Sequence, residues 1–115
     1  MACSVDERPS LACVPRAIPA HERANHFALA KQLLNEAALE RADLPAGYGF
    51  RFAADGLQQI FRFVVNERQC CPFVHFTIEL SPDSGPIWLR MTGPEGTREV
   101  LEAELDLPGA CGCAG

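Results

Sequence analysis

Pro72 divides the middle of the sequence into two different patterns. Before it, a capping-box pattern at Asp55 opens a predicted helix. The apolar stripe of that helix is formed by Leu57, Ile60, Phe61 and Val64. After Pro72, apolar and polar residues alternate over Val74–Leu80, which predicts a strand. Because a proline pushes the preceding residue out of the helical region, the helix must end at two adjacent cysteines, Cys70 and Cys71.

The rest of the chain shows helical and strand patterns of similar length. The further predicted elements are strands at Ser10–Val14, Tyr48–Phe52 and Ile87–Met91, and helices from Ala20 to about Ala42 and from Pro94 to Pro108. The predicted order is β-α-β-α-β-β-α, with about four short strands and three helices. Such a set predicts an α+β fold, a two-layer sandwich in which helices cover one face of a sheet.

The length of 115 residues is enough for one domain with a modest core. We expect a loose N-terminus over residues 1–9, a single α+β domain over 10–107 and a flexible cysteine-containing tail over 108–115.

The net charge of −5 argues against nucleic acid as a partner, because phosphate binding needs a basic surface. No apolar stretch approaches the roughly 20 residues of a membrane span, and the first residues do not resemble a secretion signal. We therefore expect a cytoplasmic protein that binds no membrane. Thiols stay reduced in that compartment, so the six cysteines are interpreted as metal ligands or redox groups.

The predicted position of Cys70 and Cys71 at a helix C-terminus bears on their chemistry. The helix dipole stabilises a thiolate at an N-terminus, but at a C-terminus it favours a cation. A soft metal ion would deprotonate both thiols by itself. No C-x-x-C pattern is present, so the common zinc-ribbon and thioredoxin signatures are absent. The alternative for Cys71 is a small buried apolar side chain.

Two thiolates suffice for linear coordination, and a third ligand would give a trigonal site. Cys13 is the best third candidate, because its predicted strand must pack close to the helices; the alternative is a core cysteine. Cys111 and Cys113 form a C-x-C pair in the tail, interpreted as an accessory thiol clamp or as a chance feature of the tail. Among the histidines, His75 is a ligand candidate and equally a surface residue. His21 and His26 are expected at the surface.

The stretches "LACVP", "LPAGYGFRF", "NERQCCPFVHFTIEL" and "IWLRMTGPEGTREVL" resemble a small, poorly characterised bacterial family. The resemblance covers roughly Ser10 to Leu105, and the E-R-x-C-C-P-F core is its most specific part. Members of that family are sometimes found beside heavy-metal resistance functions, including mercury resistance. The resemblance implies that Cys13, Cys70 and Cys71 are the positions of interest, whereas the tail cysteines are an addition to the pattern.

Three functions remain open from the sequence. The first is a soft-metal binding protein in heavy-metal resistance or handling, with mercury(II) as the favoured ion and zinc, copper(I) or arsenite as alternatives. Its partners would be the metal ion and a metal-receiving protein, and a homodimer is conceivable. The second is a thiol-dependent detoxification or redox enzyme in which Glu67 moves a proton; we favour the non-enzymatic function. The third is a protein-interaction module with structural cysteines.

Overall fold

The computed structural model describes residues 11–107. The expectations for the N-terminal lead-in and for the tail with Cys111 and Cys113 lie outside the described residues. The helices are α1 (Ala20–Lys31), α2 (Leu57–Cys70) and α3 (Thr97–Leu105), with the π-helix η3 (Gln32–Ala37) directly after α1. The strands are β1 (Glu40–Leu44), β2 (Gly47–Phe52), β3 (His75–Leu80) and β4 (Ile87–Thr92). Two short 3-10 helices, η2 (Pro15–Ala17) and η4 (Ala54–Gly56), precede α1 and α2.

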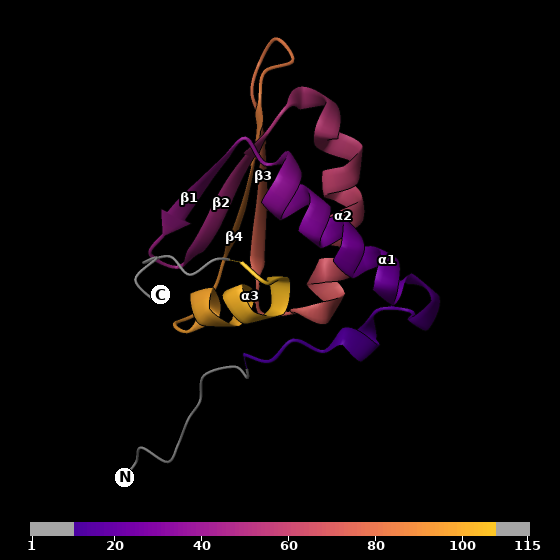
Figure 1. Cartoon of the computed structure of the whole chain (residues 1–115). Helices are drawn as coiled ribbons and strands as arrows, with labels where there is room; N and C mark the ends of the chain where they lie inside the picture. Colours follow the sequence, from indigo (N-terminus) through magenta and orange to yellow (C-terminus); the bar gives the residue numbers. More distant parts are fainter. Residues whose placement is uncertain (1–10, 108–115) are drawn as a thin grey trace.

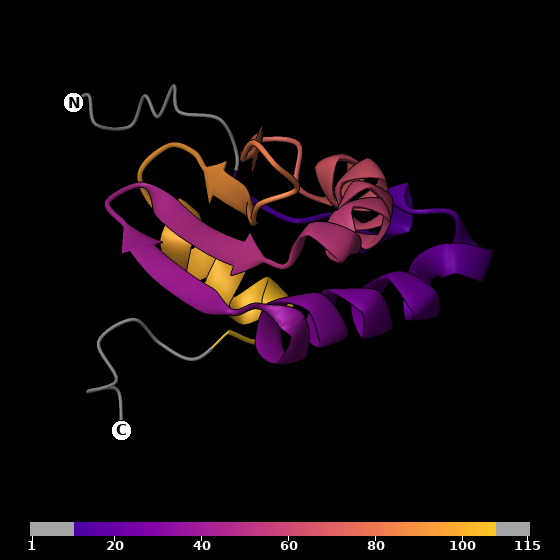
Figure 2. The ribbon, with the colours of Figure 1, turned by 90° about the horizontal axis from the view of Figure 1, so that it is seen from above.

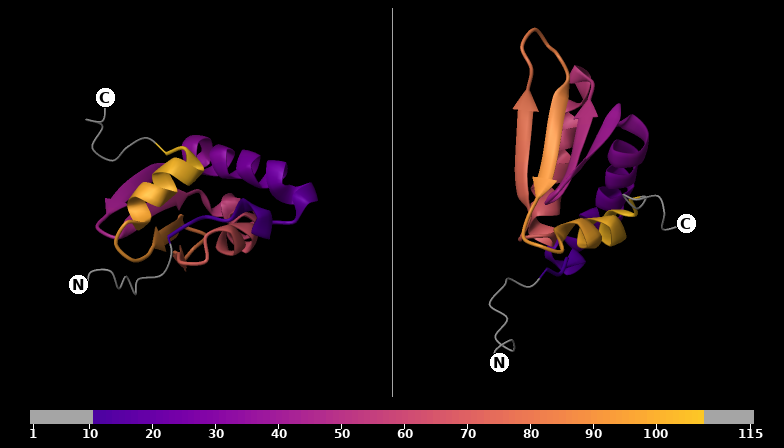
Figure 3. Two further views of the ribbon diagram at one scale, coloured as in Figure 1. Left: turned by 90° about the horizontal axis from the view of Figure 1, so that it is seen from below. Right: turned by 90° about the vertical axis from the view of Figure 1, so that its left-hand side faces the viewer.

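The four strands form one antiparallel sheet in the order β1-β2-β4-β3. Helices α1 and α2 run side by side over one face of the sheet, and α3 crosses near one end of it (Figure 1). Viewed from above, the helices and the sheet form separate layers (Figure 2). The right panel of Figure 3 shows the strands in front of α1 and α2. The predicted α+β fold class is confirmed.

The core lies between the sheet and the helices. Strand β2 contributes Tyr48, Phe50 and Phe52, all buried, as their alternation predicts. Helix α2 covers them with Ile60 and Phe63. The other members of the core include Leu33, Leu34, Ile87, Leu89, Met91, Leu101 and Leu105. Burying large side chains of this kind is worth about 1.5–3 kcal/mol each before entropy is counted.

The first strand lies elsewhere than predicted. Leu11–Val14 belongs to no strand, and its Val14 N–H donates to the carbonyl of Cys70 at 2.7 Å. The first strand of the sheet is β1, which begins inside the segment predicted as the end of the first helix and continues two residues past it. The Ala-, Glu- and Arg-rich sequence there favours a helix, but pairing with the buried strand β2 outweighs that weak local preference.

The structure also differs from the sequence predictions in smaller ways, at the helix ends and at one strand residue. Helix α2 has no side-chain cap, because Gly56 and not Asp55 occupies the N-cap position. Helix α3 ends at Asp106, whose φ of 56° is left-handed, before Pro108 is reached. Leu80 is exposed instead of facing the core. Within residues 11–107, no helix is long and apolar enough to cross a membrane.

Gly47 leaves no space for a side chain where β2 passes β4. A Cβ atom at this position would collide with the backbone carbonyl of Met91. We expect Gly47→Ala to lower the free energy of unfolding by about 2–3 kcal/mol, because the strands must separate locally. The measurement is urea unfolding.

Gly49→Ala in the same strand is the matched control. A Cβ there would meet the side chain of Trp88 at 3.4 Å, an ordinary contact. We expect a change smaller than about 1 kcal/mol. Equal losses in the two variants would contradict this account of β2 packing.

Candidate metal centre

Cysteine side chains from two distant segments meet where α2 ends. Helix α2 stops at Cys70, and the Cys71 N–H closes its last turn by donating to the carbonyl of Glu67 at 2.8 Å. The helix therefore ends at the adjacent cysteines before Pro72, as the sequence analysis predicted. The segment that carries Cys13 passes this end of α2 near α3, at the lower end of the molecule in Figure 1.

Four possible ligand atoms gather at this point. They are the Sγ atoms of Cys13, Cys70 and Cys71 and a carboxylate oxygen of Glu104, all within 4.8 Å of one another. Cys70 and Cys71 are fully buried, whereas Cys13 and Glu104 are half-buried. The structure therefore brings together the three cysteines that the sequence analysis placed in one site.

Cys13 and Cys71 are joined by a disulfide, which the sequence analysis did not predict. Their Cα atoms lie 4.5 Å apart, within the usual range for such bonds. Because the bond spans 58 positions of the sequence, the chain-entropy model assigns it about 4 kcal/mol of stabilisation. Among residues 11–107, Cys70 is the only free cysteine.

A buried carboxyl group lies directly behind the sulfur atoms. Glu67 is fully buried, one turn before Cys71 on α2. Its Oε1 lies 2.8 Å from Nε2 of His26, and its Oε2 lies 3.4 Å from Sγ of Cys71. The second contact is a hydrogen bond only in the reduced protein, because a disulfide sulfur has no proton to donate. Glu104 from α3 hydrogen-bonds Glu67 and lies 3.7 Å from Sγ of Cys70.

Burial decides the protonation of these groups. Burial raises the pKa of Glu67, and burial together with Glu67 raises the pKa of Glu104 to about 9. Burial, followed by the charges of Glu104 and Glu67, raises the pKa of Cys70 to about 12. The pKa of His26 is lowered, chiefly by burial. Near neutral pH the carboxyl pair therefore retains a proton, and Cys70 is a thiol unless a cation displaces its proton.

Two buried polar atoms in this region have no hydrogen-bond partner among the described residues. They are Oε1 of Glu104 and Nδ1 of His26. Buried polar groups nearly always have a partner, so this carboxyl group, which lies beside the sulfur atoms through its other oxygen, has unused capacity to bind a cation. The donor set points to a soft ion, because thiolates prefer soft metals.

The predictions made for the histidines and the tail cysteines differ in how they compare with the structure. His26 was expected at the surface; this is wrong, since it is 2 % exposed and stacks on Phe63. His21 is exposed as expected, and His75 is exposed at the start of β3, outside the cluster. Cys111 and Cys113 lie outside the described residues, so their predicted role stays a prediction.

The sequence analysis missed Glu104 and His26, although each carried a signal. Glu104 lies three positions after Leu101 in α3, and His26 lies four positions before Ala30 in α1. Both spacings place a residue on the same helix face as its apolar partner. A charged or polar residue on an inward helix face is rarely buried without a role.

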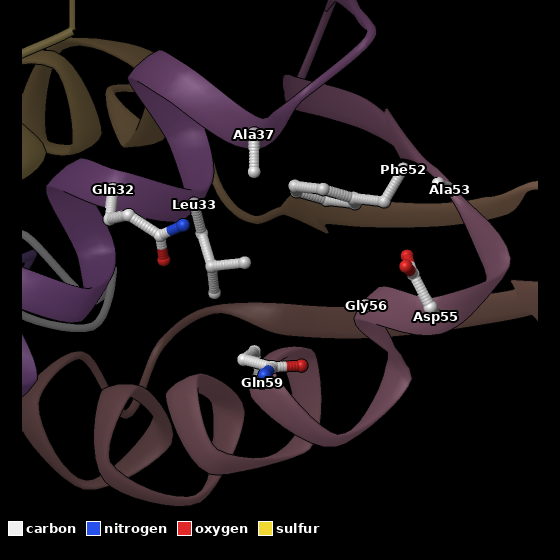
Figure 4. Close-up of a pocket in the computed structure, with 8 residues that line it drawn as sticks. All are labelled: Gln32, Leu33, Ala37, Phe52, Ala53, Asp55, Gly56 and Gln59. Atoms are coloured by element: carbon white, nitrogen blue, oxygen red, sulfur yellow. The ribbon is translucent and has the colours of Figure 1, made fainter.

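A separate surface hollow lies between η3 and the start of α2. Its volume is about 240 Å³, and Figure 4 shows Leu33 and Phe52 within it beside the polar side chains of Gln32, Asp55 and Gln59. No cysteine or histidine lines it. It therefore offers none of the ligands that a soft metal would need.

Comparisons of the chain with protein-family models, with curated proteins and with solved structures gave no match. The functional argument therefore depends on the geometry of the cluster.

The raised pKa of Glu104 makes stability depend on pH. Above about pH 7.5, where His26 has lost nearly all of its proton in both states, the unfolded chain has lost the Glu104 proton and the folded protein keeps it. Stability is therefore present at lower pH and is lost as the pH rises toward about 9. The greatest slope for one retained proton is about 1.4 kcal/mol per pH unit.

We expect Glu104→Gln to flatten this decline between about pH 7.5 and pH 8.5, as measured by urea unfolding at several pH values. Glu99→Gln on the exposed side of the same helix is the control and should keep the slope of the original protein. An unchanged slope in Glu104→Gln would show that Glu104 is ionised in the folded protein.

Proposed function

We propose that this protein binds one soft metal ion, with mercury(II) as the favoured ion, through the thiolates of Cys13, Cys70 and Cys71. The single observation that carries this proposal is the convergence of three Sγ atoms and a Glu104 oxygen within 4.8 Å of one another. Metal binding requires the reduced form, in which Cys13 and Cys71 are thiols.

The electrostatics of the site support a cation. Glu67 and Glu104 lie against the thiols, and the nearest basic side chain in the cluster, His26, is kept neutral by burial. Deprotonating three thiols here without a metal would place several negative charges in a region that lacks a counter-charge. A bound cation removes that cost, because the metal stabilises the thiolates directly.

The number and kind of ligands favour mercury over zinc. Three sulfur ligands suffice for trigonal coordination of mercury. Structural zinc is almost always tetrahedral, so zinc would need Glu104 as its fourth ligand. Copper(I) would leave more uncompensated negative charge than a divalent ion in the same buried set. Zinc, copper(I) and arsenite remain alternative occupants to be compared in one titration.

Mercury titration tests the proposal directly. We choose the full chain carrying Cys3→Ser, Cys111→Ser and Cys113→Ser, so that the only thiols are those of the cluster. The reduced protein should bind one equivalent of mercury(II), supplied as its complex with free cysteine. The measurement combines thiolate-to-metal ultraviolet absorption with native mass spectrometry.

Adding Cys70→Ser or Cys71→Ser to this background should weaken mercury binding by at least about 100-fold, since even partners outside the ligand set are worth 10–100-fold. Ser81→Ala, on a loop away from the cluster, controls for general effects of substitution. The proposal fails if both cysteine variants keep the original stoichiometry and affinity.

A second function, thiol-dependent cleavage of a carbon–mercury bond, is favoured by the carboxyl groups beside the sulfurs. Glu104 lies 3.7 Å from Sγ of Cys70, and Glu67 lies 3.4 Å from Sγ of Cys71. In an organomercurial R–Hg⁺ held by two thiolates, the carboxyl proton would pass to carbon. The electron pair of the C–Hg bond would form the C–H bond, leaving mercury(II) on the thiolates. The raised pKa of Cys70 favours metal binding over catalysis, because it indicates a thiol that is not activated as a nucleophile.

Phenylmercury acetate separates binding from cleavage. If the protein is an enzyme, the reduced chain releases benzene, and Glu104→Gln lowers the rate by about 100-fold or more because the general acid is lost. Glu99→Gln is the matched control on α3. Binding of phenylmercury without release of benzene would leave metal binding as the function.

We place this function in heavy-metal handling in the cytoplasm, whose reducing conditions would keep the three thiols available. In this setting Cys111 and Cys113 would act as an accessory pair that passes the ion to a metal-receiving protein.

A further inference from the structure

The segment Leu11–Val14, called the strap below, covers the buried cysteines without belonging to the sheet. It is attached through the Cys13–Cys71 disulfide and through the bond from the Val14 N–H to the carbonyl of Cys70. Among the described residues, the strap therefore contacts the C-terminal end of α2 at Cys70 and Cys71, two of the three cysteines of the proposed site.

The base of the strap is held separately. Ile18 is fully buried in a small apolar cluster with Cys70 and Cys71. The guanidinium of Arg23 donates from Nε to the carbonyls of Pro15 at 3.0 Å and Ile18 at 3.1 Å. The Arg23 hydrogen bonds thus fix the turn after the strap to α1 independently of the disulfide. Breaking the disulfide would free the strap while leaving its base in place.

The disulfide and the proposed metal site use the same atoms. Two of the three sulfur ligands, those of Cys13 and Cys71, form the bond. Among the described residues, the oxidised protein retains one thiol, Cys70, beside the carboxyl of Glu104, and these two groups cannot give a three-thiolate site. The two states therefore exclude each other.

We propose that the Cys13–Cys71 disulfide is a redox latch: it closes the strap over Cys70 and abolishes soft-metal binding, and its reduction opens the site. This inference rests on the proposed function, because it assigns the regulation of the same three sulfurs. Metal binding in turn protects Cys13 and Cys71 from oxidation, because their electron pairs are committed to the ion.

A peroxide is the oxidant, and the difference in exposure sets the order of events. Cys13 is half-buried and Cys71 is fully buried, so a peroxide reaches Cys13 first. The Cys13 thiolate attacks one oxygen of hydrogen peroxide, which breaks the O–O bond and gives a sulfenic acid and water. The Cys71 thiolate then attacks that sulfur and displaces the oxygen as a second water. Two thiols and one peroxide thus yield one disulfide and two waters.

Reopening needs a dithiol reductant. One of its thiolates attacks Sγ of Cys13, the more exposed sulfur of the bond, and Cys71 leaves as the thiolate. The second thiol of the reductant then releases Cys13, so that the reductant is oxidised and both cysteines are reduced.

The test uses the full chain with Cys3, Cys111 and Cys113 replaced by serine. One portion is reduced, a second is oxidised with one equivalent of hydrogen peroxide, and a third is oxidised and then reduced again. We expect three titratable thiols in denaturant for the reduced protein and one for the oxidised protein, with peptide mass spectrometry locating the bond at Cys13–Cys71. Mercury(II) affinity should fall at least about 100-fold on oxidation, because two ligands are lost, and recover on reduction.

Two further measurements distinguish a latch from a simple loss of thiols. Hydrogen exchange of the Val14 amide should become at least about 10-fold faster on reduction, because the strap is released from Cys70. In the Cys13→Ser variant, one equivalent of peroxide should leave both the Val14 exchange rate and the mercury affinity of the variant unchanged. No disulfide should form in this variant, because the adjacent Cys70 and Cys71 bridge each other poorly.

The outcomes separate this inference from the proposed function. Equal mercury affinity in the oxidised and reduced proteins overturns the latch while the proposed function stands. Equal exchange of the Val14 amide in the two states also overturns the latch. Failure of the reduced protein to bind mercury(II), together with normal formation of the disulfide and redox-dependent exchange at Val14, overturns the proposed function and leaves the closing strap supported.

Discussion

The burial of Glu67 is the interaction on which the arrangement of this region depends. This carboxyl group is fully enclosed, yet it bonds to His26 of α1, contacts Cys71 at the end of its own helix and shares a hydrogen bond with Glu104 of α3. An unpaired buried charge would cost several kcal/mol, so the three helices must keep their relative positions to satisfy it. The carboxyl group thereby fixes the place where the cysteines meet.

That arrangement has a consequence for the chemistry of the thiols. Burial and the neighbouring carboxyl groups raise the pKa of Cys70 to about 12, the opposite of what an activated nucleophile needs. The same acidic surroundings are suited to a cation. Under the proposed function, the reduced protein would keep Cys70 as a thiol until a metal of high thiolate affinity displaced its proton. The proposal would then imply selectivity for soft ions, because harder ions gain too little from sulfur ligands to displace that proton.

Much of the fold could be predicted from local patterns. The helix that ends before Pro72, the inward alternation of Tyr48, Phe50 and Phe52, and the α+β class all follow from periodicity and proline chemistry. The strand β1 could not be predicted, because its sequence favours a helix and only pairing with β2 makes it extended. The order of the strands in the sheet also could not be predicted from the sequence, since it depends on contacts between distant segments.

The candidate site could also be predicted only in part from the sequence. The proximity of Cys13 to the adjacent pair was predicted from the expectation that its segment packs near the helices, although that segment is not a strand. The disulfide to Cys71 and the contributions of Glu104 and His26 were not predicted. Helical spacing places Glu104 and His26 on inward helix faces, but it does not show that they meet the cysteines. That meeting arises where three helices and one irregular segment converge, which depends on contacts between distant segments.

The central claim is that Cys13, Cys70 and Cys71 bind one ion together. X-ray absorption spectroscopy at the mercury edge, on the reduced full chain with serine at positions 3, 111 and 113 and one equivalent of mercury(II), tests it most directly. The account predicts three sulfur neighbours around each mercury. Two sulfur neighbours, or a shell dominated by oxygen or nitrogen, would contradict it.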